Sequence, residues 1–305
     1  MIEKMLTPGD RQVIEVVVTS YCDLHCSNCT ELLDLREKRH HMTLANIERA
    51  LVVLADWVRS PGRAARVVGC FGGNACTRKD FPEIARLWKR YIPKRNAGLW
   101  TNNLFGHGDV ARECFGYWNF VVHGNDQAAA EMRAAVPMAQ VHGLDRGAMH
   151  GSILVAIEDQ IGKPGGPRDR DEMWSMIAGC DIGTKWSGAI AEKRDGTLGF
   201  WHCEVASAMS RLPRMDHLEA LALPVEPGCW ARPIGDFAEQ IRAACTACGV
   251  PLRLKGHRDD AETDDVSARW AYLAEAKPRR AVNVVGGLPT ERVRETTDYM
   301  RLRGE

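Results

Sequence analysis

Seven of the eleven cysteines in this 305-residue chain fall into two groups with the spacing of metal ligands. The first group is the C-x3-C-x2-C run of Cys22, Cys26 and Cys29. Three thiolates this close in sequence can hold three irons of a four-iron cluster and leave the fourth iron open for another ligand. A zinc knuckle is the alternative, because a structural zinc site closes with four ligands. The histidines near enough in sequence to complete it are His25, His40 and His41.

The second group consists of two single cysteines followed by a C-x2-C pair: Cys180, Cys203, Cys245 and Cys248. Four thiolates in this two-plus-two arrangement can close around one metal centre. By chemistry alone the centre is either a structural zinc ribbon or an iron–sulfur cluster. Four cysteines remain outside both groups: Cys70, Cys76, Cys114 and Cys229.

The composition argues against several other classes of protein. An odd number of cysteines in a long chain does not suit a disulfide framework. The 40 basic residues balance the 40 acidic ones and the pI is near 7.1, whereas a nucleic-acid binder needs a basic field. There is no apolar run of the roughly 18 residues that a membrane span requires, and the first residues lack a signal-peptide core. We therefore expect a cytoplasmic protein without nucleic-acid or membrane partners.

Alternating strands and helices are expected to position the first cysteine group. The β-branched run 13–18 predicts a strand that leads directly into the cysteine loop. The stretch 43–59 predicts a helix, with Thr43 as its N-cap and one apolar face. Further segments predict one more helix (81–91) and later strands at 66–71, 98–101, 120–123 and 153–156.

This alternation predicts a parallel sheet wrapped by helices. Active sites of such folds form where the strands end, and both the cysteine run and Gly72-Gly73 fall there. After residue 178 the pattern changes to a hairpin over 189–201 and a helix over 237–245. We expect three parts: 1–178, 179–250 and a C-terminal extension, 251–305, with an acidic loop at 259–265 and helices at 266–276 and 290–302.

The cysteine loop and its place after the first strand resemble the radical S-adenosylmethionine superfamily. The resemblance covers roughly residues 10–160. It implies an α/β fold, a partial (β/α)6 barrel, with a [4Fe-4S] cluster on Cys22, Cys26 and Cys29. It also implies that the open iron binds S-adenosylmethionine, and that an external one-electron reductant of the flavodoxin or ferredoxin type supplies the cluster.

Two later loops extend the resemblance to the cosubstrate site. Gly72-Gly73-Asn74 stands where the family usually has Gly-Gly-Glu, so Asn74 offers a hydrogen bond without a charge. Thr101-Asn102-Asn103 stands where relatives often have Thr-Asn-Gly and is expected to face the ribose. A further departure is Asn28, at a position where an aromatic residue commonly precedes the last cysteine.

The second cysteine group resembles the twitch extension of some radical enzymes, over residues 180–250. That extension is a small β-hairpin and helix domain, which holds an auxiliary [4Fe-4S] cluster by one cysteine before a hairpin, one after it and a late C-x2-C. The resemblance therefore assigns the second cluster to Cys180, Cys203, Cys245 and Cys248. The zinc ribbon, and with it a non-enzymatic zinc-binding module, remains the alternative.

The acidic residues bear on the substrate, and the remaining thiols bear on the reaction. The run Asp259 to Asp265 suits a polycationic sugar, although a solvated loop explains it equally well. The chain resembles the aminoglycoside epimerases that act on neomycin C, which implies an isomerase in antibiotic biosynthesis. An epimerase needs a thiol that returns the hydrogen atom, and we expect Cys229 in this role, with Cys76 as the rival. A dehydrogenase of an aminocyclitol or sugar alcohol is the alternative and needs no such thiol.

Overall fold

The computed structural model describes the residues that position both cysteine groups. They are 1–26, 28–36, 38–61, 66–122, 125–136, 141–142, 148–150, 153–252, 257–258, 263–274 and 281–284. The acidic positions 259–262 and the helix expected at 290–302 lie outside these residues.

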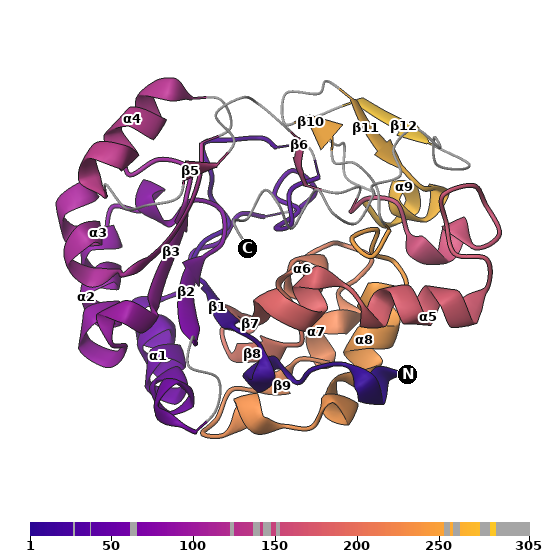
Figure 1. The fold of residues 1–305 in the computed structure, drawn as a ribbon, viewed down its shortest axis with the longest axis horizontal. Helices are drawn as coiled ribbons and strands as arrows, with labels where there is room; N and C mark the ends of the chain where they lie inside the picture. The colour runs from indigo at the N-terminus through magenta and orange to yellow at the C-terminus, as the bar shows by residue number, and fades with distance from the viewer. Residues whose placement is uncertain are drawn as a thin grey trace.

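The first half of the chain is a parallel sheet with helices along one side, as expected (Figure 1). Neighbouring strands pair in parallel from β1 through β5. The strands are β1 (Val13–Val17), β2 (Val67–Phe71), β3 (Ala97–Thr101), β4 (Tyr117–Val121) and β5 (Val141–His142). The helices that follow them are α1 (Leu44–Arg59), α2 (Phe81–Tyr91), α3 (Gly108–Cys114) and α4 (Asp126–Ala135).

Helix α1 begins where the sequence predicts. The side chain of Thr43 accepts a hydrogen bond from the backbone N–H of Asn46 at 3.2 Å, so it satisfies one of the free N–H groups at the helix start. Its apolar face, which includes Ile47 and Leu51, packs on the sheet. Ile14, Val16 and Val18 of the first strand segment point into this layer, because alternate residues of a strand face opposite sides.

The hairpin predicted after residue 178 forms, and it extends the same sheet. Strand β7 (Ser187–Glu192) pairs in parallel with β1, and β8 (Leu198–Trp201) returns antiparallel to it. The strand order is β5-β4-β3-β2-β1-β7-β8-β9, with β9 at Leu223–Pro224. β1 therefore lies inside the sheet, between the two expected parts of the chain.

The remaining elements cover the other face of the sheet and the space beyond it (Figure 1). A second apolar cluster joins Val17 of β1 to Trp201 of β8 and to Met209. The helices are α5 (Arg170–Ala178), a π-helix at Ile182–Trp186, α6 (Glu204–Met209), α7 (His217–Ala220), α8 (Ala238–Cys245) and α9 (Ala268–Ala274). The short strands are β6 (Ala148–His150), β10 (His257–Arg258), β11 (Thr263–Val266) and β12 (Ala281–Val284).

Two predictions about elements were wrong. The apolar run 153–156 is a turn rather than a strand; Ile153, Leu154 and Ala156 are buried in the second apolar cluster, and Val155 is buried in the first. Burial, not strand pairing, therefore explains its composition. The end of the acidic run, expected as loop, belongs to strand β11, which pairs in parallel with β12.

Candidate active site

The first cysteine group lies on the loop that follows β1, at the edge of the sheet where the parallel strands end. Its three thiols are partly buried. Burial raises the pKa of Cys22 to about 12 and that of Cys29 to about 11. These two thiols are protonated at neutral pH in the metal-free chain, and binding of a metal would release their protons.

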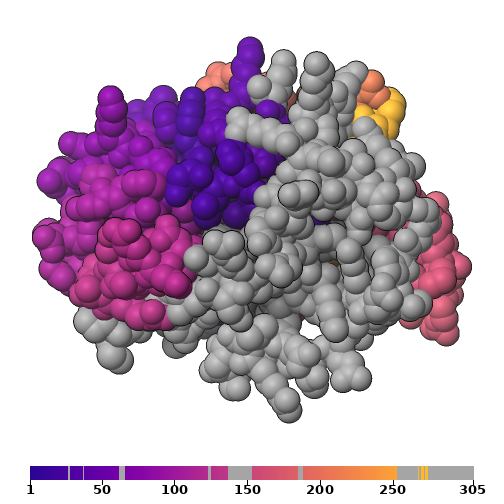
Figure 2. Space-filling view, turned by 90° about the horizontal axis from the view of Figure 1, so that it is seen from above, coloured from indigo at the N-terminus to yellow at the C-terminus, as the bar shows by residue number. Residues whose placement is uncertain are grey.

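The indigo surface of the N-terminal segment lies beside the magenta surface of the following helices in the view from above (Figure 2).

The glycine pair after β2 brings that strand end against the cysteine loop. Both residues have positive φ, 95° at Gly72 and 44° at Gly73. A Cβ atom on Gly73 would lie 2.0 Å from the carbonyl oxygen of Tyr21, and the backbone N–H of Asn74 donates to that oxygen at 2.7 Å. A side chain at Gly73 would therefore push the cysteine loop away from β2.

Asp23 connects the loop to the ends of β2 and β3, and the sequence did not single it out. Its exposed carboxylate accepts hydrogen bonds from the side-chain amide of Asn102 at 3.0 and 2.9 Å. The buried amide of Asn74 donates to the same carboxylate at 3.3 Å. Thr101 in turn donates to Asn74 Oδ1 at 2.8 Å. Residues predicted for cosubstrate binding therefore form one network around a carboxylate between two cysteines.

Asn28 has a different environment from the other residues predicted to bind cosubstrate. It is buried with φ of 53°, and its Oδ1 atom accepts a hydrogen bond from the backbone N–H of Leu154 at 3.3 Å. This contact holds the end of the cysteine loop against the turn at 153–156.

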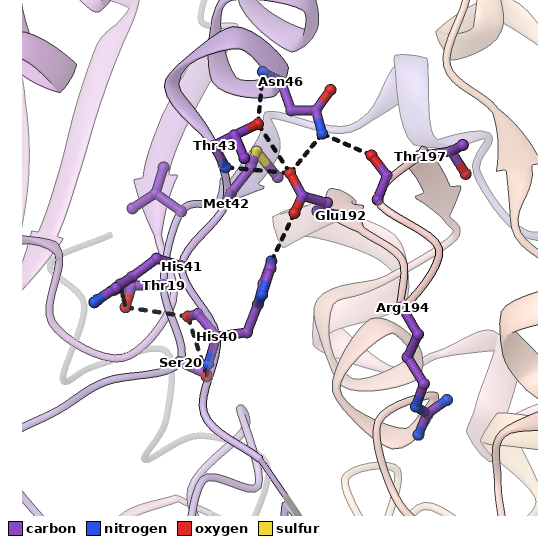
Figure 3. Close-up of polar contacts among 12 residues, drawn as sticks. Thr19, Ser20, His40, His41, Met42, Thr43, Asn46, Glu192, Arg194 and Thr197 are labelled. Carbon is purple, nitrogen blue, oxygen red and sulfur yellow. Dashed lines mark hydrogen bonds and ion pairs between the residues drawn. The ribbon is translucent and has the colours of Figure 1, made fainter.

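A small cavity adjoins the same edge, between the loop that follows β1, β7 and the C-terminal part of α6 with Arg211 beyond it. Glu192, at the end of β7, forms one wall. It accepts hydrogen bonds from the backbone and hydroxyl of Thr43, both at 3.1 Å, and from the amide of Asn46. Figure 3 shows His40 pointing at the other carboxylate oxygen, 3.1 Å away. Arg36 and Arg211 also line the cavity.

The second cysteine group lines a separate small cavity. Its four members come from the end of α5, the end of β8 and the end of α8, as the resemblance requires. Burial raises the pKa of every one of these thiols, to about 12 at Cys203. The structure therefore brings four thiols together around one largely apolar cavity. The cysteines lining it are Cys180, Cys203, Cys245 and Cys248.

Two polar side chains lie beside these thiols. His202 is buried, and its Nε2 atom is 3.3 Å from Cys245 Sγ. Burial lowers the pKa of His202 to about 3, so the ring is neutral at neutral pH. The side chain of Arg11, also buried, donates to the carbonyl oxygen of His202.

The two cysteine groups lie at opposite edges of the sheet. Cys22 follows the end of β1, whereas Arg11, next to the second group, precedes its beginning at Val13. Cys180 likewise precedes β7, which runs parallel to β1.

The four remaining cysteines are all buried. Cys229 packs next to Pro8–Asp10, at the edge where β1 begins, because Trp230 lies against Gly9. This is the edge opposite the first cysteine group. Cys76 lies at the same edge as that group, where its Sγ atom accepts a hydrogen bond from Thr101 at 3.7 Å.

The second cysteine group offers four thiols around one cavity, and thiolates are the donor type that an iron–sulfur cluster requires. Among the described residues, no three His, Cys, Asp or Glu side chains are arranged to hold a single metal ion. A four-iron cluster takes each thiolate on a different iron, and soft thiolates are the ligands it requires. Within the same residues, no helix is both long and apolar enough to cross a membrane.

No protein-family model and no curated protein matches the chain. Solved structures that resemble it include BtrN in complex with AdoMet and 2-DOIA, with a TM-score of 0.42 and 13% identity over 78% of this chain and 92% of BtrN. A second is the selenomethionine form of BtrN in an open conformation, with a TM-score of 0.40 and 12% identity over 80% of this chain and 87% of that one. Both scores are low, so the function proposed below depends on this chain's own residues.

Proposed function

We propose that this protein is a radical S-adenosylmethionine enzyme that removes a hydrogen atom from a carbinol carbon of an aminoglycoside or aminocyclitol. One observation carries this proposal. The C-x3-C-x2-C loop lies where the parallel strands end, and Asp23 joins it to the ends of the two neighbouring strands.

In this proposal Cys22, Cys26 and Cys29 hold the first [4Fe-4S] cluster. When bound and reduced by a flavodoxin or ferredoxin type of reductant, that cluster would supply the electron for reductive cleavage of S-adenosylmethionine. The chain's own residues bind and orient the cosubstrate: Gly72 and Gly73 keep the strand end close, and Asn74, Thr101 and Asn102 fix Asp23.

Two products are open to the carbon radical: an epimer, if a thiol returns a hydrogen atom, or a ketone, if the radical loses an electron and a proton. The position of Cys229 favours the ketone, because this thiol is buried at the opposite edge of the sheet from the first cysteine group. Cys76 lies at the same edge as the first cysteine group, so it is the better candidate for the hydrogen-atom donor if the product is an epimer.

The polycationic substrate is supported by sequence alone. The acidic positions 259–262 lie outside the described residues, and the run ends in β11. A panel of aminoglycosides and aminocyclitols is therefore the first set of candidates to assay.

Iron and sulfide analysis of anaerobically purified protein tests the cofactors. Two cubane clusters require about eight irons per chain. Replacing Cys26 by Ala should abolish formation of deoxyadenosine. Cys180→Ala should lose about half of the iron but should still form deoxyadenosine. Zinc with little iron would support a zinc-binding module and contradict both enzyme readings.

Turnover in deuterated water separates the two products. An epimer formed by thiol return carries one deuterium at the inverted carbon, because S–H exchanges with water; a ketone carries none there. Cys76→Ala and Cys229→Ala identify the donor, and Cys114→Ala, a buried helical thiol, is the matched control. An unlabelled ketone formed by all three variants would establish the dehydrogenase.

A further inference from the structure

A buried positive charge lies next to the backbone that carries part of the second cysteine group, because Arg11 donates to the carbonyl oxygen of His202, the residue before Cys203. Arg11 is 0% exposed and precedes β1 by two residues. Its guanidinium donates to the backbone carbonyls of His202 and, at 3.1 Å, of Leu6. Both acceptors are backbone carbonyl oxygens, so the position of the guanidinium does not depend on the conformation of another side chain.

Burial of this charge has a free-energy cost that the cavity's thiols would offset once ionised. Burial lowers the pKa of Arg11 to about 10, whereas thiolate charges on Cys203, Cys180 and Cys245 would act in the opposite direction. Arg11 therefore remains protonated at neutral pH, and its interaction with the thiols becomes favourable when they are thiolates.

The apolar surroundings of the cavity strengthen the effect of the Arg11 charge on the cysteine group. Most of its lining is apolar, including Ile177, Val205 and Met209. A charge interaction in such a medium is screened less than in water, so a guanidinium beside the thiols acts strongly on whatever they hold.

We propose that Arg11 is a positioning residue that raises the reduction potential of the second iron–sulfur cluster. This inference rests on the proposed second cluster and not on the identity of the substrate. Reduction adds one electron to a cluster that is already net negative with four thiolate ligands, and the fixed cation stabilises the more negative state.

A raised potential suits the ketone-forming outcome. In that step the carbinol radical would lose one electron, for which the second cluster is the proposed acceptor, and its hydroxyl proton would go to solvent, so that the C–O bond becomes C=O. Arg11 would make this transfer more favourable without touching the substrate.

The experiment is a redox titration of the holoprotein, followed by EPR, on Arg11→Gln and Arg11→Lys. Removing the charge should lower the ratio of reduced to oxidised second cluster about tenfold at a fixed potential, which corresponds to about 59 mV for a one-electron couple. Lysine keeps the charge and should restore most of that ratio. The first cluster's potential should not change in either variant.

Arg66→Gln is the matched control. Arg66 is also buried and donates to backbone carbonyls, those of Trp57 and Ser60 at 2.5 and 2.9 Å, just before β2 begins. Burial lowers its pKa as well, but the charge that acts on it is that of Asp10 rather than that of a cysteine. Its substitution should leave both potentials unchanged.

The outcomes are distinct. Wild-type protein with four irons or fewer would refute the second cluster itself. Arg11→Gln with both clusters present and an unchanged second potential would overturn the inference. If Arg11→Gln does not fold, Arg11→Met replaces it, because an apolar side chain of similar length tolerates burial. Failure of both neutral variants to fold, or an equal fall in Arg11→Lys, would assign Arg11 to structure alone and also overturn the inference.

Discussion

Asp23 is the residue at which the cysteine loop and two strand ends meet. Its carboxylate is exposed, while the amides beneath it, from Asn74 and Asn102, are buried. An exposed anion held by two buried donors is fixed in direction and accessible to a ligand. It supplies at this edge the negative charge that Asn74 lacks, and in the proposed function it would pair with the ammonium group of S-adenosylmethionine.

Asp23→Asn should weaken binding of S-adenosylmethionine by about 10- to 150-fold, since a charge-assisted hydrogen bond contributes roughly 1.5–3 kcal/mol. The iron content should not change, because Asp23 is not a thiolate ligand. Equilibrium binding to the reconstituted protein measures the effect. Asp34→Asn is the control, because Asp34 pairs with His25 on the same loop at 2.8 Å; an equal loss in both variants would contradict a specific role.

His40 should make the fold sensitive to acid. Burial lowers its pKa from 6.5, Arg211, Arg36 and Arg78 lower it further, and Glu192 opposes them. Below about pH 6.5 the unfolded chain binds a proton that the folded chain does not, so stability falls as the pH falls, by at most about 1.4 kcal/mol per pH unit.

His40→Gln should therefore lose less stability than wild type between about pH 6.5 and 5. Denaturant unfolding at several pH values measures this slope. His217→Gln, at an exposed histidine of α7, should behave like wild type. Identical slopes for all three proteins would mean that His40 does not contribute to the loss of stability at low pH.

At the scale of elements, β7 and α1 are joined by one carboxylate. Glu192, 149 residues from Thr43 in sequence, receives the backbone N–H and hydroxyl of the N-cap residue of α1. The negative charge of the carboxylate is also stabilised by the positive, N-terminal end of the dipole of α1. The contact fixes where α1 begins relative to the hairpin and forms one wall of the cavity beside the cysteine loop.

Glu192→Gln should lower the free energy of unfolding by about 1–3 kcal/mol, because a buried amide cannot accept all of these hydrogen bonds. Glu48→Gln removes a carboxylate that pairs with Arg90 at the surface, and it should change stability by less than about 0.5 kcal/mol. Thermal or denaturant unfolding of the two variants makes the comparison. Equal effects would show that burial at Glu192 adds nothing.

The elements that could be predicted from sequence are those whose signals are local. The cap at Thr43 and the periodicity of the following helix placed α1 correctly, and the β-branched run placed β1. The pairing of β7 with β1 was not predicted, since nothing local specifies a partner 174 residues away. Asp23 was missed for a similar reason: a loop carboxylate has no periodic pattern, and its partners come from two other loops.

At the scale of the whole molecule, the length of β1 separates the two cysteine groups. Its five residues alone correspond to roughly 15 Å, at about 3.3 Å per residue. The loop before Cys22 and the residues around Arg11 lie beyond the two ends. Two clusters so placed are expected to assemble independently.

The EPR spectrum of the fully reduced protein should therefore be close to the sum of two single-cluster spectra, because dipolar coupling falls with the cube of distance. Cys180→Ala isolates the first cluster and Cys26→Ala isolates the second. Strong splitting absent from both single-cluster spectra would mean that the clusters lie much closer than this sheet places them.

The central place of β1 also has a consequence for how the chain acquires its structure during synthesis. β1 leaves the ribosome early, but its second hydrogen-bonded edge waits for β7, which ends at Glu192. Until then the nascent chain carries an open edge on an otherwise apolar strand, the kind of surface that promotes aggregation. A fragment ending at residue 178 should consequently be recovered in inclusion bodies or bound to chaperones, whereas one ending at 252 should remain soluble.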